Sequence, residues 1–141
     1  MYICLMNDFT KMLADWDCFG EPEAMPLFQT LHERIMEECG ELATVSWKLQ
    51  KTQLSYYNPR MFACISLLRI KRKADMPHPY ITVSFGLGKP FRHSRIGVVT
   101  EVAPNRWTHH VLVSSLQEID DQLMSWIKEA AQFSVEKSKH I

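Results

Sequence analysis

The sequence predicts a single α+β domain in which helices pack on one antiparallel sheet. Helical patterns lie near both ends of the chain, and a run of about five strand patterns without intervening helices lies between them. Strands that follow one another directly favour an antiparallel meander. The length of 141 residues, with 46% hydrophobic and 23% charged residues, is typical of one globular domain. We therefore expect one domain over residues 1–141, with an extension or short helix at 1–20 and a frayed tail at 134–141.

Two N-terminal helices are expected. Apolar residues at near-helical spacing predict a short helix over residues 5–16. A longer helix is predicted over residues 22–39, because apolar residues recur every four positions and charged residues cover the opposite face. Pro22 suits the first turn of this helix, and Gly40 suits its C-terminal cap.

The middle of the chain changes to the alternation of strands. Candidate strands lie at residues 42–47, 51–57, 61–70, 80–87, 95–102 and 106–113. The segment 61–70 is apolar on both faces, which is typical of a central strand covered on both sides. These strands form the predicted meander.

A C-terminal amphipathic helix follows the last strand. Ser115 and Glu118 have the spacing of a capping box, and an apolar stripe runs from Leu116 to Ala130. Asp120 and Asp121 fall in the expected first turn, where the helix dipole favours acidic residues. We expect this helix to pack on the sheet.

Cysteine spacing and hydropathy indicate a cytoplasmic protein. No pair among the four cysteines has CxxC spacing, and none lies near a histidine at zinc-ligand spacing, so we expect reduced thiols and no metal. No apolar run approaches the roughly 18 residues of a membrane span. The N-terminus lacks the pattern of a signal peptide, and Met6 is an alternative start to Met1.

Charge is distributed unevenly although the formal net charge is zero. Residues 42–110 hold eleven bases and two acids, a net charge of +9, and the flanking segments together carry −9. One interpretation is a basic sheet face that attracts an anionic ligand or nucleic acid. The other is internal neutralisation, in which acidic helices dock beside a basic sheet.

The favoured hypothesis is a non-catalytic binding module without a cofactor. Alternation along residues 51–57 places polar and basic side chains on one face, near arginines of the neighbouring strands. Such a surface could hold a phosphate or stack a base, although it could equally be a solvated outer face. The candidate ligand-binding residues are Lys51, Tyr57, Arg60, Arg95, Arg106, Trp107 and His109.

Two alternatives remain open at this stage. His109 and His110 are adjacent on a strand and should point to opposite faces, so either one could serve a small hydrolase-like enzyme as acid or base. The chain could also be a homodimeric small-molecule sensor or interaction domain, with its Trp and Met residues at the interface.

Four segments resemble a known family. The chain resembles the bacterial and archaeal family DUF5655 over roughly residues 25–133. The similarity is carried by residues 51–56, 61–64 and 81–87, and above all by the run from Arg106 to Asp120 with its following helix. Its members have no established activity, so the resemblance implies a fold and a cytoplasmic origin but no catalytic residue. In some proteins a similar domain follows a restriction-nuclease-like domain, which implies nucleic-acid biology by association only. We find no PD-(D/E)xK pattern in this chain.

Overall fold

The computed structural model describes residues 16–39 and 45–139, with side chains through residue 135. It consists of one antiparallel sheet of six strands with two α-helices, so the predicted α+β class is confirmed. The helix expected at residues 5–16 lies outside the described residues, as does Gly40. None of the helices in the described ranges combines the length and the hydropathy of a membrane span.

The sheet has the spatial order β1-β2-β3-β4-β6-β5, and every neighbouring pair is antiparallel. Its strands are β1 (Ser46–Leu49), β2 (Gln53–Tyr57), β3 (Met61–Ser66), β4 (Ile81–Leu87), β5 (Ile96–Ala103) and β6 (Arg106–Val113). The last part differs from a simple meander, because the chain leaves β4 for the outer strand β5 and returns through a hairpin to β6 beside β4. This return places the two adjacent histidines of β6 near the middle of the sheet.

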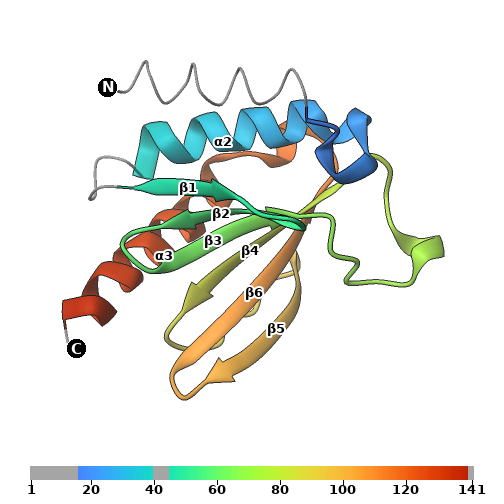
Figure 1. Ribbon diagram of the computed structural model, residues 1–141. Helices are drawn as coiled ribbons and strands as arrows, with labels where there is room; N and C mark the ends of the chain where they lie inside the picture. Colours follow the sequence, from blue (N-terminus) through green and yellow to red (C-terminus); the bar gives the residue numbers. More distant parts are fainter. Residues whose placement is uncertain (1–15, 40–44, 140–141) are drawn as a thin grey trace.

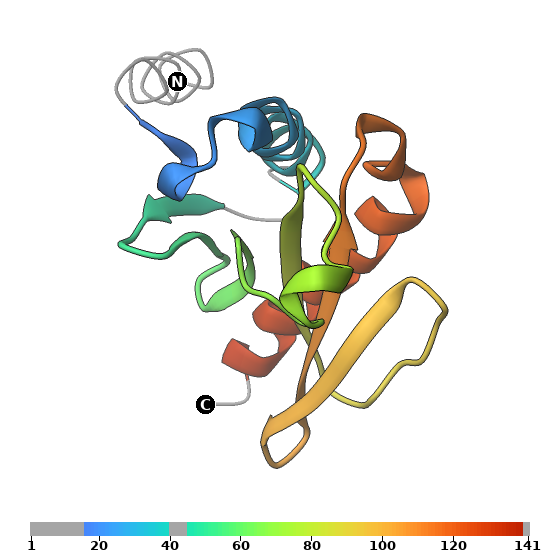
Figure 2. The same ribbon diagram turned by 90° about the vertical axis from the view of Figure 1, so that its right-hand side faces the viewer.

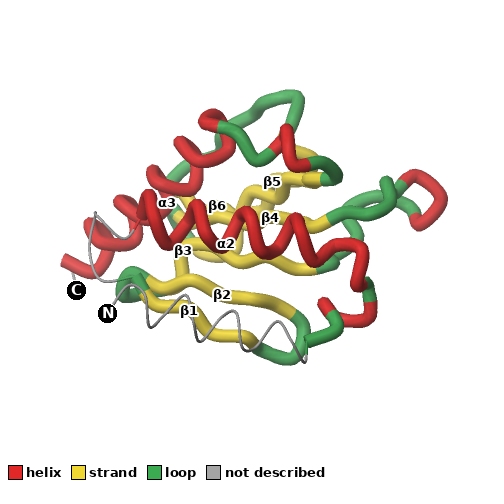
Figure 3. Tube along the Cα trace, turned by 90° about the horizontal axis from the view of Figure 1, so that it is seen from above, coloured by secondary structure: helices red, strands yellow, loops and turns green. Residues whose placement is uncertain are grey.

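Both α-helices cover the same face of the sheet. Figures 1 and 3 show α2 (Met25–Cys39) and α3 (Asp121–Lys139) lying side by side on that face. The His32 ring of α2 is hydrogen-bonded to Tyr56 of β2, and Trp126 of α3 stacks on Phe85 of β4. Alternation along the strands therefore sends one set of side chains into the helical layer and the other set to the second face.

The N-terminal helix begins later than its pattern predicts. The turns η1 (Cys18–Gly20) and η2 (Pro22–Ala24) are 3-10 turns, and the α-helix starts at Met25. Pro22 is still the first residue of its turn, where a missing N–H leaves no hydrogen bond unmade. The predicted helix thus contains a 3-10 turn followed by fifteen α-helical residues.

Strand β3 is shorter than the predicted strand at residues 61–70, because the chain leaves the sheet after Ser66. The Thr82 hydroxyl donates a hydrogen bond to the Leu68 carbonyl at 2.6 Å. The Ile70 side chain reaches Gly97 of β5, where a Cβ would lie 2.7 Å from the Ile70 Cδ1. Residues 67–70 therefore cross part of the second face. The loop beyond them, with η3 (Lys73–Asp75), projects from that end of the sheet (Figures 1 and 2).

The predicted capping box exists, but it closes a separate 3-10 turn, η4 (Leu116–Glu118), rather than the C-terminal helix. The α-helix begins at Asp121, and the Asp120 carboxylate caps it by accepting a hydrogen bond from the Leu123 N–H at 3.0 Å. The helix also continues to Lys139, so residues 134–139 of the tail expected to fray are helical. Arg95 from the β4–β5 connection binds the same Asp120 carboxylate at 2.9 Å.

Asp120→Ala is expected to lower the free energy of unfolding by about 1 kcal/mol, because the helix loses its cap. Urea denaturation of both proteins at pH 7 measures the loss. Asp121→Ala is the matched control, because the exposed Asp121 carboxylate also pairs with an arginine, Arg34 at 3.0 Å, but Asp121 is the first helical residue rather than the cap. An equal loss in the two variants would contradict the capping role of Asp120.

Candidate functional site

The second face of the sheet carries a polar row across its three middle strands. Cys64 of β3 pairs in register with Ser84 of β4, and Ser84 pairs with His110 of β6. Residues opposite one another on neighbouring strands point to the same face. The row is therefore set by register, and no sequence motif marks it.

Ser84 and His110 are bound to each other within this row. The Ser84 Oγ lies 2.7 Å from the His110 Nδ1, and only 6% of Ser84 is exposed. Burial, and then the neighbouring His109, lower the pKa of His110 below its usual range. Burial also raises the pKa of the Cys64 thiol, although a hydrogen bond with Ser84 opposes this effect. At neutral pH the row consists of a neutral imidazole, a hydroxyl and a protonated thiol.

A cavity of about 330 Å³ opens beside this row. Strands β3 and β4 pair only between residues 63–66 and 82–85, and beyond Phe85 they diverge (Figure 1). The C-terminal half of α3 lies behind the divergence and contributes Phe133. The cavity walls are mostly apolar and include Met61, Phe62, Phe85, Leu87, Val102 and Phe133.

Polar groups enter this cavity from two sides. Cys64 and Ser84 reach it from the polar row, and Arg60, Arg106 and Trp107 reach it from the strand ends. The turn that holds Arg60 is tied to α3, because the Ser134 hydroxyl donates to the Arg60 carbonyl and Asn58 Nδ2 donates to the Ala131 carbonyl. Among the residues that the structure describes, neither the Arg60 nor the Arg106 guanidinium forms an ion pair. Two arginines that form no ion pair with a described residue therefore line an apolar cavity.

The other four predicted ligand residues lie elsewhere. Lys51 is exposed in the turn between β1 and β2, and the half-buried Tyr57 ends β2 without lining the cavity. Arg95 is held by Asp120, by the Glu118 carbonyl and by the Trp126 ring, whose centroid is 5.8 Å from the Arg95 Cζ. The seven predicted residues therefore do not form one continuous basic face. Arg95 instead neutralises the acidic start of α3, as the interpretation of internal neutralisation predicts.

His109 points to the opposite face from His110, as alternation predicts. It is fully buried beneath α3, and its ring is stacked on Phe85 with centroids 5.2 Å apart. The Phe91 N–H donates to the His109 Nε2 at 2.9 Å, so the neutral ring carries its proton on Nδ1. Burial lowers the pKa of His109. Because it is enclosed in the helical layer, His109 does not belong to the cavity.

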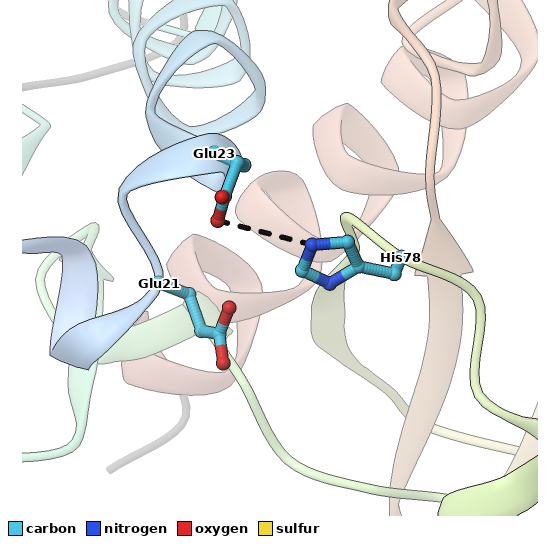
Figure 4. A group of neighbouring side chains, drawn as sticks. All are labelled: Glu21, Glu23 and His78. Atoms are coloured by element: carbon cyan, nitrogen blue, oxygen red, sulfur yellow. Dashed lines mark ion pairs between the residues drawn. The ribbon is translucent and has the colours of Figure 1, made fainter.

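A group of possible metal ligands that the sequence analysis missed lies at the other end of the molecule. Figure 4 shows Glu21 and Glu23, from the start of η2, facing His78 of the loop that carries η3. Their ligand atoms lie within 4.8 Å of one another, and all three residues are exposed. His78 and Glu23 form a surface ion pair at 3.8 Å.

Comparison with known proteins gives one match. The family model described as "Domain of unknown function (DUF5655)" matches residues 18–134. The resemblance drawn over residues 25–133 is therefore corrected in its extent, since the match also takes in η1 and η2. No curated protein and no solved structure matches the chain.

Proposed function

Because this chain belongs to the DUF5655 family, whose function is not described, we propose from the site itself that it binds a small organic anion. The ligand occupies the cavity between β3, β4, β6 and α3. The observation that carries the proposal is a pair of arginines, Arg60 and Arg106, that line an apolar cavity and form no ion pair with a described residue.

The lining indicates the two parts of the ligand. An arginine binds carboxylate, sulfonate or phosphate oxygens through paired N–H groups, so the anionic group lies at Arg60 and Arg106. The aromatic and aliphatic walls suit an apolar body, which gains free energy when it leaves water. The volume is at the lower end of the range of about 300–1,000 Å³ for small-molecule sites, which favours a compact ligand.

A small anion is favoured over nucleic acid by the distribution of the bases. A nucleic-acid surface requires several cationic groups along one continuous track. Arg95 already has an acidic partner, and Lys51 lies in a turn away from the cavity. Of the three arginines predicted as ligand residues, Arg60 and Arg106 therefore remain, and two arginines suit one anionic group better than a polyanion.

The first test is fluorescence titration with 8-anilinonaphthalene-1-sulfonate, which combines an aromatic body with one anionic group. Arg60→Gln and Arg106→Gln are each expected to raise the Kd about tenfold, because each removes a charge-assisted hydrogen bond. Lys51→Gln is the matched control, because it removes a base outside the cavity. The neutral analogue N-phenyl-1-naphthylamine should show no dependence on either arginine.

Equal dissociation constants in all three variants would contradict an anion site at the cavity. Fluorescence polarisation with labelled single-stranded DNA, at two salt concentrations, tests the alternative directly. Salt-sensitive binding that is weakened by Lys51→Glu as much as by Arg106→Glu would favour a nucleic-acid face instead.

A further inference from the structure

We propose that Ser84 is a nucleophile activated by His110, and that the cavity hydrolyses a carboxylic ester that also carries the anionic group bound at Arg60 and Arg106. The identity of the ester rests on the proposed function. The nucleophile itself rests on separate observations, namely the hydrogen bond between Ser84 and His110 and the position of Ser84 in the cavity wall.

The geometry is that of a nucleophile and its base. The Ser84 hydroxyl reaches the His110 Nδ1 at 2.7 Å, within the range required for direct proton transfer. Ser84 and His110 lie in register on the paired strands β4 and β6, so backbone hydrogen bonds on both sides fix their separation. A dyad held by neighbouring strands of a sheet is positioned more precisely than one held by loops.

The protonation state is also suitable. In the tautomer that carries its proton on Nε2, the neutral His110 ring leaves Nδ1, 2.7 Å from the Ser84 Oγ, free to accept the hydroxyl proton. Burial favours the neutral imidazole at pH 7, since it lowers the pKa of His110. A neutral imidazole is the form that can act as a general base.

Ser84 is a better candidate than Cys64, although both line the cavity. Ser84 lies between Cys64 and His110 in the register of the three strands, so the imidazole contacts the hydroxyl directly. Burial raises the pKa of the Cys64 thiol, which keeps this side chain protonated and weakly nucleophilic.

The reaction follows from these positions. As the Ser84 Oγ bonds to the acyl carbon, its proton moves to the His110 Nδ1. The bond from the acyl carbon to the leaving oxygen then breaks, and His110 returns the proton to the departing alcohol. Water attacks the acyl-Ser84 ester, with His110 again accepting a proton, and the carboxylic acid leaves as Ser84 is restored. Ester and water thus become acid and alcohol without another reactant.

The experiment uses diisopropyl fluorophosphate, which needs no anionic group and therefore tests the nucleophile independently of Arg60 and Arg106. The Ser84 oxygen should bond to phosphorus with loss of fluoride, and peptide mass mapping of the full chain should place the adduct on Ser84. His110→Gln is expected to slow labelling about 100-fold, the contribution of a general base. Ser84→Ala should abolish labelling.

Matched controls are Ser66→Ala and His78→Gln. Ser66 is a buried serine of β3 that pairs with Thr82, and His78 is exposed in the loop that carries η3. Both variants should label like the unaltered protein. An adduct mapped to Cys64, no adduct at all, or a labelling rate unchanged by His110→Gln would overturn the proposal. Dye binding without labelling would support the anion site and contradict the nucleophile. Labelling without dye binding would support the nucleophile and contradict the anion site.

Discussion

Lowering the pH from 7 to 4.5 is expected to reduce the free energy of unfolding by about 2–3 kcal/mol through His32 alone. His32 lies on α2 and is only 3% exposed. Burial lowers its pKa to about 4 from a usual value of 6.5. The His32 Nδ1 lies 2.7 Å from the Tyr56 hydroxyl in a buried hydrogen bond, so a charged imidazolium at this position would be enclosed in the core beside a neutral partner.

The sign follows from the proton balance. In the unfolded chain His32 protonates as the pH falls through about 6.5, while the folded protein keeps it neutral until about pH 4. Between these values the unfolded state binds more protons, so stability falls as the pH falls. The lowered pKa values of His109 and His110 add losses of the same direction.

Urea denaturation of the unaltered protein and of His32→Gln at pH 7 and 4.5 measures the effect. The variant should be less stable at pH 7, because glutamine fits the Tyr56 site poorly, but it should lose much less stability on acidification. His78→Gln is the control, since this histidine is exposed and should keep the full acid dependence. The same acid dependence in His32→Gln and His78→Gln would show that His32 is not the main titrating group.

The elements that sequence reasoning predicted well are those whose pattern is local. Strand β6 occupies the predicted residues 106–113, because alternation and β-forming residues continue without interruption over its whole length. The segment 61–70 was predicted as one strand, and only tertiary contacts explain its early end. Three of residues 67–70 are apolar, but the segment does not pair as a strand: Ile70 packs at Gly97 of β5, and Leu68 stays 48% exposed.

The site shows the same limit. Arg60, Arg106 and Trp107 were predicted as ligand residues, and the structure brings them to one cavity. Arg95 was predicted as a ligand residue in the same way, but it pairs with Asp120 instead. The two residues are 25 positions apart in the sequence, so no local pattern shows that they meet. His110 was predicted as a possible acid or base, whereas no sequence pattern marks Ser84, and the two meet only because β5 is the outer strand and β6 returns beside β4. The order of strands, which single-sequence patterns do not determine, decides the composition of the site.

Phe85→Ala is expected to lower the free energy of unfolding by about 3–5 kcal/mol, the usual cost of removing a fully buried aromatic ring. Phe85 is 1% exposed and lies at the centre of the helix–sheet layer. Its ring stacks on His109 at 5.2 Å and on Trp126 at 6.1 Å. Because strands and α3 fix both neighbours, the space that Phe85 leaves cannot close, and urea denaturation at pH 7 measures the loss.

Phe91→Ala is the matched control for this loss. Phe91 also packs against Trp126, with centroids 5.8 Å apart, but it does so from the surface and is 39% exposed. Its removal leaves a space that water can fill, so we expect a loss of about 1 kcal/mol. If the two substitutions cost the same, the stack of Phe85 between His109 and Trp126 is not the centre of the core. A larger loss for Phe85→Ala, accompanied by weaker dye binding, would instead indicate that one ring supports both the helix–sheet layer and the wall of the cavity.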